Sequence, residues 1–305
     1  NTLAAPIKFD SSGNNLQAFT GLGDDIVSLS DGFNILETHT GSDTITVLGG
    51  TNEVLTGDGS DIVEIYAGTN DLDTGPGNDK ILIETGNAGL PTSIEIKTGD
   101  GDDEILISDR LNQAEFLLLD GGTGEDRITV TNSNNFIVPE NVGFEKFSIT
   151  NIIHQSLDFS TSGFTDIELN SGSTVDNSSI ILNLAAEQKL TLNNIIDGDI
   201  LAASISDGGL VINQADNANV LDLDLVGVGG DFSNANTNLL LDLAGPSLSS
   251  ANLTNKDSSF IALQNSGGAL RGLNIAGSGT LGIMNMLPSS ITDISGANSL
   301  INLNL

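Results

Sequence analysis

The stretch TGDGSDIVEIYAGTNDLDTGPGNDKILI, residues 56–83, contains two copies of one pattern and decides the plan of the first half of the chain. In each copy a turn with two glycines ends in an aspartate, and a short apolar run follows. Aligned on that aspartate, the pattern G-x-G-x-D-x-U-x-U, with U apolar, recurs in near-constant register at Asp25, Asp43, Asp61, Asp79, Asp103 and Asp126. The first four aspartates lie 18 residues apart. A fixed period predicts stacked units, because one turn cannot bury its own apolar face.

Each 18-residue unit also contains a weaker second half. GFNIL (32–36), GTNEVL (50–55) and GTNDLD (68–73) recur with the same spacing. Residues such as Val27 and Leu29 alternate with polar neighbours, which predicts short strands with one buried side. The sequence therefore predicts one coil per 18 residues, with two thin parallel sheets that face a narrow apolar core.

The turns offer oxygen ligands for a hard cation. Glycine permits backbone conformations that turn carbonyl oxygens inward, and the aspartate adds a carboxylate. Ca²⁺ takes about 6–8 oxygen ligands at roughly 2.3–2.6 Å. Two successive turns can supply that set, so we predict Ca²⁺ between neighbouring aspartate turns.

Residues 20–130 resemble the RTX, or haemolysin-type, nonapeptide repeats of secreted bacterial proteins, whose pattern G-G-x-G-x-D-x-U-x forms a calcium-binding parallel β-roll. The resemblance implies carboxylate ligands at Asp25, Asp43, Asp61, Asp79, Asp103 and Asp126. It places the turn glycines of the metal sites at Gly21, Gly23, Gly41, Gly57, Gly59, Gly75, Gly77, Gly99, Gly101, Gly122 and Gly124.

This chain departs from the family pattern in three ways. Threonine replaces the first glycine in five of the six turns, and His39 replaces a later turn glycine. The second half-repeat has Asn34, Asn52 and Asn70 where the family usually has aspartate. Insertions, one of them GNAGLP (86–91), lengthen the two steps before Asp103 and Asp126. We therefore expect ions along one edge only, about five in all.

Composition narrows the choice of partners. The formal net charge of −32 excludes nucleic acid and anionic membrane surfaces as natural partners. Cysteine is absent, so no disulfide or thiol chemistry is available. No apolar run reaches the roughly 18 residues that span a bilayer, and we predict no membrane insertion. The chain begins with Asn1 rather than Met, so we expect a processed product or a fragment.

From about residue 133 the glycine-aspartate turns stop, and we divide the chain into domains 1–132 and 133–305. The second domain contains short apolar strands at intervals near 20 residues, which favours an irregular β-solenoid over a β-sandwich. NLAAEQKL (183–190) is the best helical candidate and could equally form a turn or loop. FEKFSITN and FTDIELNSG in this domain resemble the β-strand repeats of RTX-containing bacterial S-layer proteins.

The sequence does not favour an enzyme. Its two histidines, His39 and His154, cannot form an H-E-x-x-H motif, and no G-x-S-x-G elbow is present. Adjacent carboxylates such as Asp24 and Asp25 fit calcium turns better than a glycosidase pair. We predict no catalytic residues and no organic cofactor.

The sequence thus predicts an all-β, secreted protein of the bacterial cell surface that folds on binding Ca²⁺ and assembles into an S-layer-like lattice. By resemblance it would leave the cell through a type I secretion channel. Its expected partners are further copies of itself, with a cell-surface polysaccharide as a second candidate. A calcium-stiffened adhesin and an ice-binding β-roll remain the alternatives, the latter because Thr20, Thr38, Thr56 and Thr74 recur in register.

Overall fold

The computed structural model describes residues 8–10, 13, 15–84, 93–108, 117–131, 137–139, 141–150, 156–170, 179–195, 209–229, 239–284, 293–295 and 300–303. These residues form parallel strands and turns and contain no helix. The chain divides into two compact units, residues 1–132 with 139–147 and residues 133–138 with 148–305. The first unit therefore includes a segment after residue 132 that the sequence division places in the second domain.

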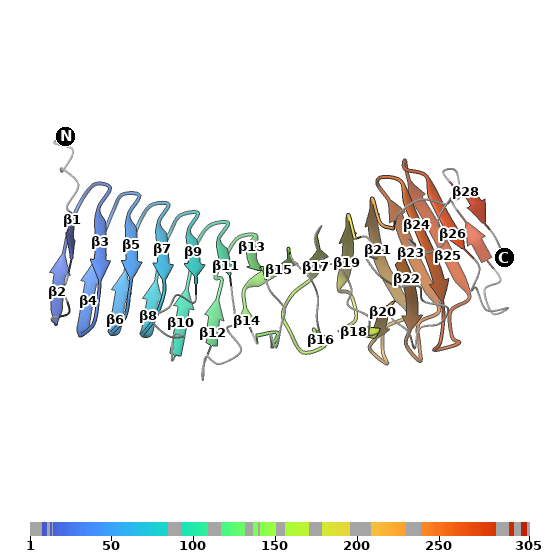
Figure 1. Cartoon of the computed structure of the whole chain (residues 1–305), viewed down its shortest axis with the longest axis horizontal. Coiled ribbons are helices and arrows are strands. Elements are labelled where there is room, and N and C mark those ends of the chain that lie inside the picture. The colour runs from blue at the N-terminus through green and yellow to red at the C-terminus, as the bar shows by residue number, and fades with distance from the viewer. Residues whose placement is uncertain are drawn as a thin grey trace. The chain divides into compact units, whose positions relative to one another are not determined.

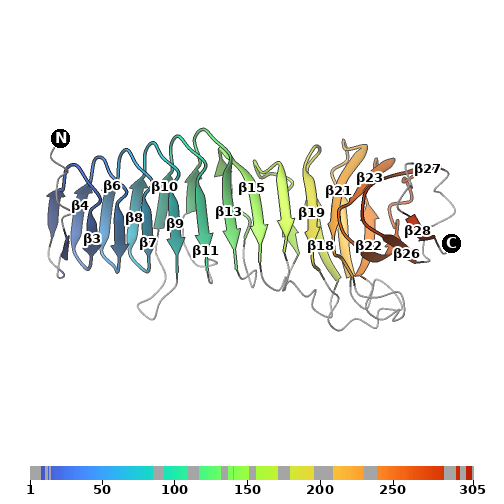
Figure 2. The same cartoon turned by 90° about the horizontal axis from the view of Figure 1, so that it is seen from above.

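The first unit is a β-roll with two strands per coil (Figures 1 and 2). One row of strands comprises β1 (Lys8–Asp10), β3 (Ile26–Leu29), β5 (Thr44–Val47), β7 (Ile62–Ile65), β9 (Lys80–Ile83), β11 (Glu104–Ile107) and β13 (Asp126–Val130). The facing row comprises β2 (Leu16–Phe19), β4 (Phe33–Glu37), β6 (Thr51–Leu55), β8 (Thr69–Asp73), β10 (Ser93–Lys97), β12 (Leu117–Asp120) and β14 (Asn141–Val142). The predicted two-sheet roll is confirmed.

The register of the roll follows the sequence period. Ile45 of β5 pairs with Val63 of β7, and Val63 pairs with Ile81 of β9, each one 18-residue step away. Ile81 then pairs with Ile105 across the longer step, so the insertion leaves the register unchanged. The insertion GNAGLP (86–91) itself lies outside the described residues.

The apolar core lies between the two rows. Val27, Leu29, Leu36, Val54 and Leu72 are all at most 3% exposed, as the predicted alternation requires. The alternating residues of each strand point outward and are partly or fully exposed, for example the eBeBe pattern of β6. Because the outer face is solvated, these parallel strands show alternation rather than the continuous apolar runs of a sheet covered on both faces.

The second unit is an irregular parallel solenoid. One row of strands comprises β17 (Asp166–Leu169), β19 (Lys189–Asn193), β21 (Val220–Val226), β23 (Ser250–Asn255), β25 (Gly272–Gly277) and β27 (Asp293–Ser295). The other comprises β16 (Leu157–Asp158), β18 (Ser179–Leu184), β20 (Gly209–Gln214), β22 (Leu239–Ala244), β24 (Ser259–Gln264), β26 (Leu281–Met284) and β28 (Leu300–Leu303). The remaining strand, β15 (Phe144–Ile149), contains the division between the units.

Parallel pairing excludes the sandwich and confirms the solenoid. Coil length varies, since hydrogen-bonded neighbours are 30 residues apart for Asn252 and Asp222 but 22 for Asn274 and Asn252. The segment NLAAEQKL (183–190) forms the end of β18, a turn and the start of β19, so it is not a helix.

Candidate metal centre

Six aspartates form one continuous row in the first unit, which we call the aspartate ladder: Asp25, Asp43, Asp61, Asp79, Asp103 and Asp126. All six side chains are at most 2% exposed. The backbone N–H of each aspartate except the last donates to Oδ1 of the aspartate one coil later, at 2.7–2.8 Å. The spacing in the sequence therefore brings these carboxylates together in space, each beside its equivalent in the next coil.

The second carboxylate oxygen of the ladder has no donor. Oδ2 is buried and accepts no hydrogen bond in five of the six aspartates: Asp43, Asp61, Asp79, Asp103 and Asp126. A buried carboxylate without a compensating partner is costly, and such groups are neutralised by a proton or paired with a cation. The ladder is thus a row of oxygen atoms that fits positive ions.

Burial raises the pKa of these carboxyls. It is the largest influence on Asp43, Asp61 and Asp103, whose pKa values all lie above the ordinary 3.8. The same cause raises the pKa of Asp79 to about 7 and that of Asp126 to about 6. Repulsion from neighbouring carboxylates adds to the rise, whereas the backbone N–H donors oppose it.

A second row, which we call the threonine ladder, consists of Thr38, Thr56, Thr74 and Thr98. Each hydroxyl donates to the carbonyl oxygen one coil later, at 2.8–3.1 Å, and each side chain is fully buried. The hydroxyls also lie near the aspartates and lower their pKa values, for example Thr38 at Asp43. A hydroxyl has one proton, and here the carbonyl takes it, so the threonines do not satisfy Oδ2.

The turn glycines have the conformation that the pattern predicts. All the glycines named above as turn glycines have φ between +81° and +152°. His39 takes the same conformation at φ +73° with an exposed side chain. A Cβ on Gly41, Gly59 or Gly77 would overlap the carbonyl oxygen of the glycine one coil earlier. Rows of carbonyl oxygens therefore pass through the same turns as the aspartates.

Side chains alone do not make a complete metal site. Within the described part of the chain, no three His, Cys, Asp or Glu side chains gather in a way that could hold a metal ion. A cation in these turns would therefore need one or two carboxylates together with backbone carbonyls. That division of ligands suits Ca²⁺, which accepts both kinds of oxygen.

The opposite edge of the roll has a neutral ladder. Asn34 donates from Nδ2 to Oδ1 of Asn52, and Asn52 donates likewise to Asn70, both at 2.7 Å. Asn52 also donates to the carbonyl of Gly49 at 3.0 Å. These amides satisfy one another, so this edge has no charge that calls for an ion.

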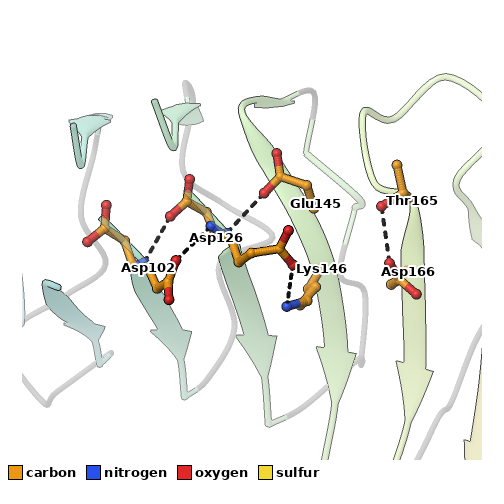
Figure 3. Close-up of polar contacts among 8 residues, drawn as sticks. Asp102, Asp126, Glu145, Lys146, Thr165 and Asp166 are labelled. Carbon is orange, nitrogen blue, oxygen red and sulfur yellow. Dashed lines mark hydrogen bonds and ion pairs between the residues drawn. The ribbon is translucent and has the colours of Figure 1, made fainter. Parts of the chain in front are cut away.

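Sequence reasoning missed two features of the turns. Side chains just before the ladder aspartates form an outer row, in which Asp24 accepts the N–H of Ser42 and Asp102 accepts that of Glu125. Glu145 continues the inner row by accepting the N–H of Asp126 (Figure 3). No glycine turn precedes Glu145, so the repeat pattern gave no signal for it.

The adjacent carboxylates do not form a catalytic pair. Asp24 and Asp102 are exposed, whereas Asp25 and Asp103 are buried, so the members of each pair point to opposite sides of the chain. His39 is exposed on its turn, and His154 lies outside the described residues. The described residues include no helix long and apolar enough to cross a membrane. Comparison with protein families, curated proteins and solved structures gives no match to this chain.

Proposed function

We propose that this chain is a secreted, calcium-dependent structural protein of the bacterial cell surface that assembles with copies of itself. The observation that carries the proposal is the row of buried ladder carboxylates whose Oδ2 atoms have no donor. An ordinary core would not retain such a row, because each unpaired charge opposes folding.

The ladder residues would couple folding to the ion. Asp43, Asp61, Asp79, Asp103 and Asp126 would present Oδ2 to it, and the turn glycines would present carbonyl oxygens. Bound Ca²⁺ would supply the positive charge that makes burial of these carboxylates favourable. Because the ladder exists only in the folded roll, the free energy of binding contributes directly to the free energy of folding.

The location of the protein follows from calcium supply. Extracellular modules bind Ca²⁺ in the 10⁻⁴–10⁻³ M range, which the cytosol does not reach. Before export the ladder carboxylates would repel one another and keep the roll open. Outside the cell the ladder aspartates would be filled and the coils would close.

Surface charge supports assembly through cations. About five Ca²⁺ ions would cancel only about ten of the negative charges, so the folded chain stays strongly acidic. Glu53, Asp71 and Glu95 lie side by side on β6, β8 and β10 and face outward. Such a row repels a second copy unless cations lie between them, which makes assembly as well as folding dependent on divalent ions.

Ice binding finds less support. The recurrent threonines Thr38, Thr56, Thr74 and Thr98 are fully buried and donate within the roll, so they offer no surface to ice. The exposed middle position of the turns varies between Leu22, Thr40 and Asp58. A regular flat array is therefore lacking along these turns.

The deciding experiment is electron microscopy of the purified chain in EGTA and in millimolar Ca²⁺, with circular dichroism of the same samples. We expect β-structure and ordered sheets or filaments to appear together in Ca²⁺ only. Folding in Ca²⁺ without assembly would favour the adhesin alternative. β-structure that is the same in EGTA at neutral pH would contradict the calcium proposal itself.

A further inference from the structure

We infer that Glu145 and the corner at Gly143 form an additional cation site at the C-terminal end of the aspartate ladder. This inference rests on the proposed calcium function and adds one site to those between successive aspartate turns. It involves a residue that lies outside the repeat pattern.

The last coil of the roll turns differently from the others. Strand β14 is joined to β15 by Gly143 alone, where the earlier coils use a glycine-rich turn that ends in aspartate. Gly143 has φ +78°, the left-handed conformation that such a corner needs. The sharper corner places Glu145 one coil beyond Asp126, where the next ladder aspartate would otherwise stand.

Glu145 makes the contact that defines the ladder. The N–H of Asp126 donates to Oε2 of Glu145 at 2.9 Å, just as the earlier N–H groups donate to Oδ1 of the next aspartate. Figure 3 shows the Glu145 carboxylate turned toward Asp126, in line with the preceding contacts of the row. The longer glutamate side chain thus replaces aspartate where the turn is missing.

Unsatisfied oxygen atoms gather at this end of the ladder. Asp126 is fully buried, and its Oδ2 has no donor. A Cβ built on Gly121 would lie 2.8 Å from that Oδ2 and 2.8 Å from the carbonyl oxygen of Gly143. Both oxygens therefore border the space that the missing side chain of Gly121 leaves open. With Glu145 they provide two carboxylates and a carbonyl, a ligand set that suits Ca²⁺.

The neighbouring lysine does not neutralise the pair. Lys146 follows Glu145 in the sequence, but its Nζ lies 2.7 Å from the carboxylate of Glu125 on the outer row. The charge of Glu145 also contributes to the raised pKa of Asp126, which shows that the two carboxylates interact. A cation between them would relieve that repulsion.

The test uses Glu145→Gln, because glutamine keeps an oxygen that can accept the N–H of Asp126 and removes only the charge. Native mass spectrometry of the full chain in Ca²⁺ would count bound ions, and a calorimetric titration would give affinities. We expect the variant to bind one ion fewer than the wild type. Glu125→Gln removes the same charge from the adjacent exposed side chain and should keep the wild-type count.

A second variant approaches the same site independently. Gly121→Ala places a methyl group between Asp126 Oδ2 and the Gly143 carbonyl, and should also remove one ion. The double variant should lose one ion and not two, because both changes affect a single site. An unchanged ion count and affinity in both single variants would overturn the inference and leave the proposed function intact. A wild-type chain that binds no Ca²⁺ would instead refute the proposed function.

Discussion

Single residues of the roll are constrained by the coil before them. Gly57 and Gly21 occupy the same repeat position with similar φ values, +95° and +102°. A Cβ on Gly57 would overlap the carbonyl oxygen of His39, whereas a Cβ on Gly21 would meet nothing within 4 Å. The two glycines therefore separate the cost of conformation from the cost of close approach.

We predict that Gly57→Ala destabilises the calcium-loaded chain by about 3 kcal/mol or more, and Gly21→Ala by about 1–2 kcal/mol. The second figure is the cost of a left-handed alanine alone. Urea unfolding of both variants in millimolar Ca²⁺ would measure the difference. Equal costs would mean that the coils do not approach as closely as described.

The charge of a ladder aspartate has opposite effects with and without calcium. Asparagine at position 61 keeps an oxygen for the N–H of Asp43 and removes a buried, uncompensated charge. In EGTA we predict that Asp61→Asn stabilises the roll by about 1 kcal/mol. In saturating Ca²⁺ it should destabilise the roll by about 2 kcal/mol, because a filled site is lost.

Asp71→Asn is the matched control for this test, since Asp71 is exposed on β8 and lies outside the ladder. It should change stability by less than about 0.5 kcal/mol in either condition. Thermal melts in EGTA and in Ca²⁺ provide the comparison. If Asp61→Asn shifts both melts in the same direction, its carboxylate does not act as an ion ligand.

At the scale of the element, the ladder makes the calcium-free roll sensitive to pH. The folded-state pKa values are raised above 3.8, to about 7 at Asp79 and about 6 at Asp126. The folded roll therefore binds more protons than the unfolded chain between about pH 4 and pH 7. The linkage relation then requires its stability to fall as pH rises through that window.

We predict that in EGTA the melting temperature of the roll rises as pH is lowered from 8 to 5. The gain from the ladder should be complete near pH 4, where the unfolded carboxyls also become protonated. In Ca²⁺ the same acidification should lower stability, because protons compete with the ion for the carboxylates. Circular dichroism melts across this range test both signs. A calcium-free melt that is independent of pH would show that the ladder carboxylates are not buried.

Sequence patterns predicted the strands of the roll well because its period is constant. Residues 18 apart are neighbours in space, so Val27, Ile45 and Val63 could be aligned from the sequence alone. In the second unit the coil length varies, and the predicted strands omitted β18, β23 and β26. Strand β23 conceals its inner face, because the fully buried Asn255 stands in line with Ala251 and Leu253.

Contacts that depend on an irregular register were beyond the sequence. Lys189 and Lys256 seem unrelated in the chain, yet both contact Asp224, at 2.7 Å and 2.6 Å. Burial alone would raise the pKa of Asp224, but the two lysines outweigh it and hold that pKa below the ordinary value. Glu145 was missed for a similar reason, since its place in the ladder comes from the corner at Gly143 rather than from a repeat.

At the scale of the whole molecule, the two units compensate buried acids in different ways. The first leaves the Oδ2 atoms of its ladder to an external cation or a proton. In the second, Asp224 is paired with two lysines, and Asp242 accepts the N–H of Ser266 at 2.7 Å. The second unit thus carries its own compensation among these residues.

We predict that removal of calcium unfolds the first unit and leaves the second folded. Hydrogen exchange at neutral pH in EGTA should show lost protection in β3 to β13 and retained protection in β19 to β25. The same strands should all be protected in millimolar Ca²⁺. Loss of protection in both units on adding EGTA would show that the second unit also depends on calcium.

The uniform contacts of the ladder make its inner coils interchangeable. Removing residues 43–60 would bring Asp61 into the place of Asp43, with the N–H of Asp25 facing an identical acceptor. The number of coils can therefore change by whole steps while every internal joint stays the same. Glu145 has no such equivalent among the ladder aspartates, so the terminus of the series is unique although its length is free to vary.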